Sequence, residues 1–164
     1  MTANYYKGSA MRDSILGQIV RTGAQTFPQG GPGTQTLFTV HTGAVLVTSF
    51  FGLVTTVPGS DPGFVVGTAP TTGTAETNGI ATTVALTEEA GTWFSVVDTP
   101  TTSKPGALTI GAHAGNVTFG ILAPFPVSAG TITATASNAV TGAINWYLTY
   151  IPLDEGAYVG ALTA

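Results

Sequence analysis

The sequence predicts one all-β domain, an antiparallel β-sandwich or barrel, preceded by an N-terminal arm that carries a short helix. Two observations predict the β domain: about nine short runs rich in Val, Ile, Thr and aromatic residues, and clusters of Gly, Pro, Asn and Asp between these runs. The arm is predicted from a change in composition near residue 36. The length of 164 residues suits a single domain, since domains commonly have about 100–200 residues.

The arm begins with a stretch, residues 9–22, that has the periodicity of a short amphipathic helix. Ser9 suits its N-cap, and Gly23 suits its end. The apolar residues at helical spacing are Met11, Ile15, Leu16, Ile19 and Val20. The following stretch, TFPQGGPGTQT (26–36), is dense in Gly and Pro, which is typical of a linker. We therefore assign residues 1–36 to an arm and linker and residues 37–164 to the body.

The body is expected to consist of strands joined by turns. The expected strands are residues 36–40, 44–57, 64–68, 80–86, 92–97, 107–110, 117–122, 131–137 and 143–151. Thr42-Gly43 is expected to make a tight first hairpin, Asn78-Gly79 to make a turn, and residues 87–91 to form a longer hairpin loop. These connections predict antiparallel pairing, and about nine short strands predict a sandwich or barrel.

Two details concern single strands. The last run, residues 143–151, alternates between two faces, which are Ile144, Trp146, Leu148 and Tyr150 on one side and Ala143, Asn145, Tyr147, Thr149 and Ile151 on the other. Both faces are partly apolar, so this strand is expected to be central in the sandwich or to have its outer face against a neighbour. Pro152 is expected to end the strand because proline lacks an amide donor. In the second run, Gly52 is expected to mark a bulge or bend.

Charge is scarce and unevenly distributed. Only 7% of the residues are charged, against about 25% in an average soluble domain, and threonine is the commonest polar residue. Three cations against one carboxylate give the first 21 residues a net charge of +2, whereas Lys104 against seven carboxylates gives the remainder −6. Mixed charge and net repulsion hold free molecules apart in solution. The low charge therefore predicts a surface that other molecules cover. The opposite net charges of the arm and the body predict that the arm binds another molecule.

The composition argues against several classes of partner. Four Lys and Arg residues are too few for a nucleic-acid interface, which needs clustered cations against phosphates. The absence of cysteine excludes disulfides, thiolate chemistry and zinc ribbons. The start of the chain lacks the apolar core of a secretion signal, and the longest apolar run (44–57) is too short and too interrupted to span a bilayer. We expect no membrane partner and synthesis in a cytoplasm.

No enzymatic, cofactor or metal site is predicted. The pairs Glu88-Glu89 and Asp154-Glu155 are adjacent carboxylates that point apart, whereas a hydrolase needs two acids facing each other about 5–10 Å apart. A Ser-His-Asp site would have to use His41 or His113, the only histidines, but no Gly-x-Ser-x-Gly motif surrounds any serine. Ligand spacing for a metal and a phosphate-binding Gly loop are also missing. We therefore expect a protein that is not an enzyme.

Three aromatic residues, Trp93, Trp146 and Tyr147, leave one hypothesis for a small ligand open. They could form a platform on which a sugar stacks. The alternative is that they fill the core from alternating strands, as large aromatic side chains commonly do.

Two segments carry a resemblance to a known class of proteins. These are LFTVHTGAVLVTSFFGLVTT (37–56) and PVSAGTITATASNAVTGAINWYLTYIPLDEGAYV (126–159). The early pattern is Phe38-x-Val40-x-Thr42-Gly43, and the late one runs from Thr141-Gly142 to Trp146-x-Leu148-x-Tyr150-x-Pro152-Leu153-Asp154. In style they resemble the small decoration or cement proteins that sit on the outside of assembled capsids of tailed bacteriophages. The resemblance implies a β-barrel or jelly-roll body, usually trimeric, bound at symmetry axes between capsomers.

The resemblance and the composition together give the expected function. We expect a virion structural protein that forms a homotrimer and binds the major capsid protein on the capsid exterior, after synthesis in the host cytoplasm. The arm residues expected to contact the partner are Tyr5, Tyr6, Lys7, Arg12, Ile15, Ile19 and Arg21. The alternative is a tail-associated or receptor-binding phage protein with a carbohydrate-binding surface.

Overall fold

The computed structural model describes residues 17–26, 33–57, 63–85, 89–99, 107–113, 124–137 and 141–162. Within these ranges every regular element is a strand, which confirms the all-β class. The strands are β1 (Gln18–Arg21), β2 (Gln25–Thr26), β3 (Gly33–His41), β4 (Val45–Thr56), β5 (Gly63–Pro70), β6 (Glu76–Ala85), β7 (Trp93–Thr99), β8 (Ala107–His113), β9 (Phe125–Val127), β10 (Gly130–Ala136), β11 (Ala143–Pro152) and β12 (Tyr158–Ala161).

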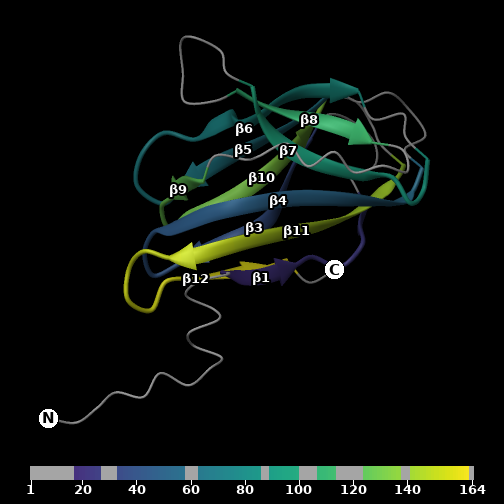
Figure 1. Ribbon diagram of the computed structural model, residues 1–164. Helices are drawn as coiled ribbons and strands as arrows, with labels where there is room; N and C mark the ends of the chain where they lie inside the picture. The colour runs from purple at the N-terminus through teal and green to yellow at the C-terminus, as the bar shows by residue number, and fades with distance from the viewer. Residues whose placement is uncertain are drawn as a thin grey trace, which may run out of the picture.

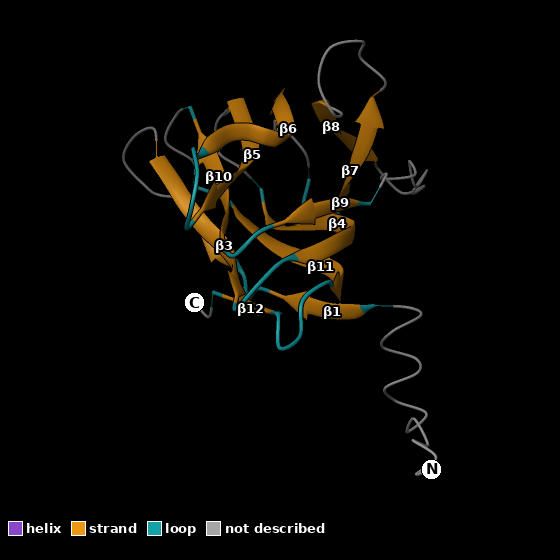
Figure 2. Cartoon of the chain, turned by 90° about the vertical axis from the view of Figure 1, so that its left-hand side faces the viewer, coloured by secondary structure: helices purple, strands orange, loops and turns teal. Residues whose placement is uncertain are grey.

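The strands follow one order, β1-β11-β4-β7-β8-β6-β5-β10-β3-β12, with β2 paired to β11 and β9 paired to β4. This order folds over on itself, so that β1, β11 and β4 form one layer and β12, β3, β10 and β5 form the facing layer (Figures 1 and 2). The end strands β1 and β12 lie side by side in both views. All pairings between described strands are antiparallel except β6 with β8, which meet in parallel at Ala81 and Leu108. The predicted antiparallel sandwich is thus confirmed.

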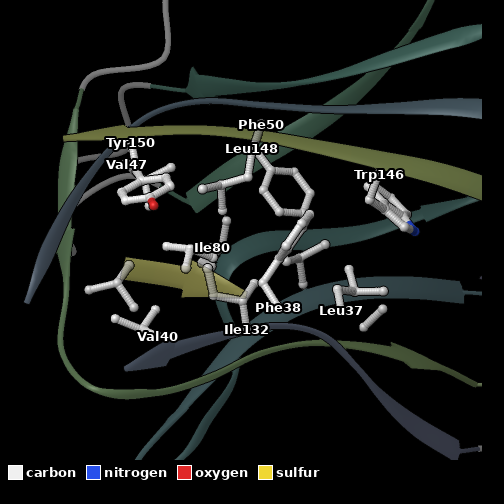
Figure 3. Packing of buried hydrophobic residues seen from close by; sticks show 14 of the residues in the cluster. Leu37, Phe38, Val40, Val47, Phe50, Ile80, Ile132, Trp146, Leu148 and Tyr150 are labelled. Atoms are coloured by element: carbon white, nitrogen blue, oxygen red, sulfur yellow. The ribbon is translucent and has the colours of Figure 1, made fainter. Parts of the chain in front are cut away.

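The core lies between the two layers and is entirely apolar at its centre. Phe50 of β4 meets Phe38 of β3 edge to face, with ring centroids 5.9 Å apart, and also contacts Trp146 of β11 at 5.3 Å (Figure 3). Ile132 of β10 and Ile80 of β6 complete the facing side. Burial of such side chains contributes about 1.5–3 kcal/mol each, which makes this contact between layers the main source of stability.

Strand β11 is central in its layer, as its sequence predicted. It pairs with β4 along its length on one side, and with β1 and the short β2 on the other. Ile144, Trp146 and Leu148 are almost completely buried, whereas Asn145 and Tyr147 of the other face are partly exposed. The predicted assignment of the two faces is therefore confirmed.

Gly52 has a different role from the one predicted. The β4–β11 register shifts at Thr48 and at Thr55, and it is regular at Gly52, so the bulges lie elsewhere. A Cβ atom at Gly52 would lie 2.9 Å from Cζ3 of Trp146 and 3.1 Å from Cγ2 of Ile144. Gly52 therefore makes room for the largest side chain of the core.

The N-terminal helix prediction is wrong where the structure describes the chain. Residues Gln18 to Arg21 form strand β1, which pairs with β11 from Tyr150 to Tyr147. The apolar spacing that suggested a helix instead places Val20 against the core and Ile19 in solvent. Four residues are too few to distinguish the two-residue period of a strand from the 3.6-residue period of a helix. The pairing with β11 therefore determines that this segment is a strand. Residues 9–16 lie outside the described residues.

Three predicted turns also differ from the structure. Thr42-Gly43 does not close a hairpin, because β3 pairs with β10 and β12 while β4 pairs with β11; the turn carries the chain from one layer to the other. Asn78-Gly79 lies inside β6, where the register with β5 shifts between Ala81 and Glu76. The loop around residues 87–91 does not join paired strands, since β8 lies between β6 and β7.

Some strands were not predicted, and one prediction is untested. Four short strands, β1, β2, β9 and β12, were not predicted from the sequence. Strand β3 begins at Gly33, inside the predicted linker, and β1 lies inside the predicted arm. Residues 117–122 and 27–32 lie outside the described residues.

Replacing Gly52 with Ala should lower the free energy of unfolding by about 1–3 kcal/mol, because the new methyl group overpacks against Trp146. The measurement is denaturant unfolding of the purified chain. Ser49→Ala, on the outward side of the same strand, is the control and should change stability by less than about 0.5 kcal/mol. Equal or higher stability of Gly52→Ala would contradict the close packing.

Candidate interaction surface

Strand β1 is held against β11 by backbone and side-chain hydrogen bonds. The amide of Thr22 donates to the carbonyl of Trp146 at 2.9 Å, and the amide of Trp146 donates to the Thr22 hydroxyl, also at 2.9 Å. The Tyr150 hydroxyl donates to Oε1 of Gln18 at 2.7 Å. Thr22 is buried, and its hydroxyl accepts the hydrogen bond of the Trp146 amide in place of a backbone carbonyl of a neighbouring strand.

The outward side of β1 carries two of the predicted contact residues. Ile19 is 71% exposed, the highest value among the large apolar side chains of the described residues, and Arg21 is exposed as well. Arg21 is also the only Lys or Arg among the described residues. We call Ile19 and Arg21 the β1 patch. The other predicted contact residues lie outside the described residues: Tyr5, Tyr6, Lys7, Arg12 and Ile15.

A second apolar surface follows the turn between β11 and β12. Leu153 is 52% exposed and Tyr158 is 49% exposed, with the exposed carboxylate of Glu155 between them in the sequence. The ring of Tyr158 stacks on His41, with centroids 4.5 Å apart and planes 17° apart. We call Leu153, Glu155 and Tyr158 the turn patch. This surface was not predicted from the sequence, although Pro152 followed by Asp-Glu-Gly and a short apolar run could have indicated a turn and a last strand.

Asp154, next to the turn patch, has a structural role. Its Oδ2 accepts a hydrogen bond of 2.7 Å from the amide of Ala44, and the amide of Leu153 donates to the carbonyl of Ala44. Gly43 fits beneath it, since a Cβ atom there would lie 2.6 Å from Cβ of Asp154. The Asp154 carboxylate therefore fastens the turn after β3 to the turn after β11. Asp154 and Glu155 were considered as one acidic pair from the sequence. In the structure Asp154 binds the backbone of Ala44, whereas Glu155 is exposed.

Of the three aromatic residues of the predicted sugar platform, two lie on the outward side of the sheet and one is buried. Trp146 is 1% exposed and belongs to the core, so it cannot stack on a ligand at the surface. Trp93 and Tyr147 lie on the outward side of the sheet, with ring centroids 5.4 Å apart, and Trp93 is 36% exposed. Phe51 and Leu53 lie between them on β4 by register. We call Phe51, Leu53, Trp93 and Tyr147 the aromatic face.

Two buried polar atoms on the outward side of these strands have no hydrogen-bond partner: Oγ of Ser95 and Oδ1 of Asn145. Ser95 lies opposite Phe51, and Asn145 lies opposite Leu53. Both therefore adjoin the aromatic face, where unpaired polar atoms are unusual and call for an explanation.

The opposite layer carries paired threonines on the side away from the core, of which Thr133 is buried. Strands β3 and β10 place three threonine pairs in register, Thr34 with Thr135, Thr36 with Thr133 and Thr39 with Thr131. The hydroxyls of the first pair are 2.8 Å apart. Such cross-strand pairs satisfy polar groups without charge.

The residues considered for catalysis lie on separate elements as far as the structure describes them. His41 stacks on Tyr158, Glu89 is exposed, His113 lies in β8, and Glu88 is outside the described residues. The described residues contain no group of three His, Cys, Asp or Glu side chains placed to hold a metal ion. They also contain no helix long and apolar enough to cross a membrane.

Comparison with known proteins gives no relative. The chain matches no family model, and no curated protein or solved structure is detectably similar to it. Its function must therefore be argued from its own surfaces.

Asp154→Ala should lower the free energy of unfolding by about 1 kcal/mol, because the Ala44 amide loses its charged acceptor. Glu89→Ala removes an equally exposed carboxylate without a side-chain bond to the backbone and should change stability by less than about 0.5 kcal/mol. Chemical denaturation of both variants makes the comparison. Equal stabilities would show that the link between the two turns contributes nothing.

Proposed function

We propose that the protein is an accessory structural protein of a tailed-bacteriophage capsid, which self-associates and decorates the outer surface of the major capsid lattice. One observation carries the proposal: the large exposed apolar side chains of the β1 patch and the turn patch stand on a surface with few charges. Exposed apolar groups rimmed by polar residues can mark sites of protein association on soluble proteins. The jelly-roll connectivity and the homotrimer, which the resemblance implies, belong to this proposal.

The physical demands of decorating a capsid agree with this surface. A decorating protein binds many equivalent sites, and simultaneous contacts can raise its overall affinity far above that of one contact. Every charge buried in such contacts would have to be desolvated at a cost. Threonine hydroxyls, paired as Thr34 and Thr135 are, keep the surface wetted without that cost.

In this proposal the arm ends where strand β1 begins. Because β1 belongs to the sheet, Ile19 and Arg21 are surface residues of the body, and the capsid contacts fall to residues before Gly17. The candidates are Tyr5, Tyr6, Lys7, Arg12 and Ile15, a set that combines aromatic side chains with two cations. Aromatic residues and arginine are the types enriched in protein interfaces.

Removing residues 2–16 should abolish binding to purified capsids while leaving the body folded, because β1 and Thr22 are kept. Co-sedimentation with capsids measures occupancy, and circular dichroism measures folding. Removing residues 2–22 is the comparison and should also lower stability, because the Trp146 amide loses its acceptor. Unchanged occupancy of the shorter deletion would refute the role of the arm.

A second function is favoured by a specific observation, the exposed Trp93 beside Tyr147 with two unpaired polar atoms nearby. Such a surface suits a sugar that stacks on aromatic rings, and it would place the protein among receptor-binding or tail-associated components.

A glycan array separates the two functions. Decoration predicts no glycan signal for the unmodified chain. Receptor binding predicts a signal that Trp93→Ala removes and that Thr131→Ala, on the opposite layer, leaves intact. A signal with that dependence would overturn the decoration proposal in favour of the second.

A further inference from the structure

The β1 patch and the turn patch are complementary in charge and alike in apolar character. The β1 patch combines Ile19 with Arg21, the only cation of the Lys and Arg type among the described residues. The turn patch combines Leu153 and Tyr158 with the carboxylate of Glu155. Each patch therefore has what the other would need in an interface, an apolar contact and a charge of opposite sign.

The opposite charges of the two patches, Arg21 and Glu155, cannot pair within one chain. Arg21 lies opposite Tyr147, and β11 continues from there to Pro152 before the turn that carries Glu155 begins. At about 3.4 Å per residue, these five residues place the two ends roughly 17 Å apart. The yellow turn after β11 and the end of β1 point in opposite directions in Figure 1. The pairing of these two charges is thus available only between two molecules.

We infer that the occupant of each patch is a second copy of this chain, which docks head to tail so that Arg21 of one copy meets Glu155 of the next. Ile19 then packs against Leu153 and Tyr158 of the neighbour. A head-to-tail contact uses two different surfaces of each chain, and repeated rotation closes it into a ring. The number of copies, three, rests on the proposed function; the identity of the two surfaces does not.

The geometry of the turn patch suits this role. Tyr158 is held by its stack on His41, and Leu153 is held through its amide on Ala44, so both side chains stand on a fixed backbone. A surface that is ordered before binding loses less conformational freedom on association. Arg21 extends from a strand paired in the sheet, which fixes the other half of the contact.

A charge swap on the full chain tests the inference. Sedimentation velocity over a dilution series should give the unmodified protein a mass near three times 16.5 kDa. Arg21→Glu and Glu155→Arg should each raise the dissociation constant between copies at least about tenfold, because each places like charges in contact. The double variant, Arg21→Glu with Glu155→Arg, should restore association to within about threefold of the unmodified protein.

Glu76→Arg is the matched control, since it makes the same change of charge at another exposed carboxylate and should leave the mass unchanged. Circular dichroism confirms that every variant is folded. A monomeric unmodified protein, unaffected single variants, or a double variant that stays dissociated would each overturn the inference. Capsid co-sedimentation tests the proposed function independently of self-association. If self-association depends on the two charges as expected but the protein does not bind capsids, the proposed function is refuted and the inference about the two surfaces stands.

Discussion

The packing of Trp146 over Gly52 is the contact on which the rest of the structure depends. Trp146 is the largest of the fully buried side chains, and it fits only because β4 has no side chain at the facing position. Its backbone amide and carbonyl bind Thr22, so the same residue holds both the core and the edge strand β1. The alternation of β11 then fixes which residues of the layer face outward.

Threonine supplies the hydrogen bonds that charged residues provide in other surfaces. At the two bulges of β4, the hydroxyls of Thr48 and Thr55 donate to the carbonyls of Thr149 and Ala143, at 3.2 and 3.1 Å. These bonds satisfy carbonyl groups where the ladder is interrupted. At the end of β1 the Thr22 hydroxyl instead accepts a hydrogen bond from the amide of Trp146. The low charge of the sequence is therefore compatible with a well-bonded sheet, and the outward faces remain free for contacts with other molecules.

Much of the fold could be predicted from the sequence, and the gaps have physical causes. The long strands β4, β10 and β11 follow from local alternation and β-branched residues, which each segment carries by itself. The pairing of strands depends on contacts distant in the sequence. Thr42-Gly43 has the composition of a hairpin turn, yet β3 pairs with β10 and β12 while β4 pairs with β11, all distant in the sequence. Strand β1 likewise exists only because β11 is beside it.

The surfaces were harder to predict than the core. The faces of β11 follow from its period, but both are partly apolar, and the packing of Trp146 against Phe50 is what shows which face is buried and removes Trp146 from the sugar platform. Ile19 and Arg21 were predicted as partner contacts of the arm from their residue types. Only their register with β11 shows that they belong to the body. The turn patch depends on β12, whose four residues carry too short a pattern to be recognised.

Amide hydrogen exchange at Thr22 tests most directly whether Trp146 joins the edge strand to the core. The account predicts that the Thr22 amide exchanges nearly as slowly as the amide of Leu148, through unfolding of the whole sheet, because its acceptor is the buried Trp146 carbonyl. Exchange of Thr22 within about tenfold of an unprotected amide, while Leu148 stays protected, would show that β1 is detached and would contradict the account.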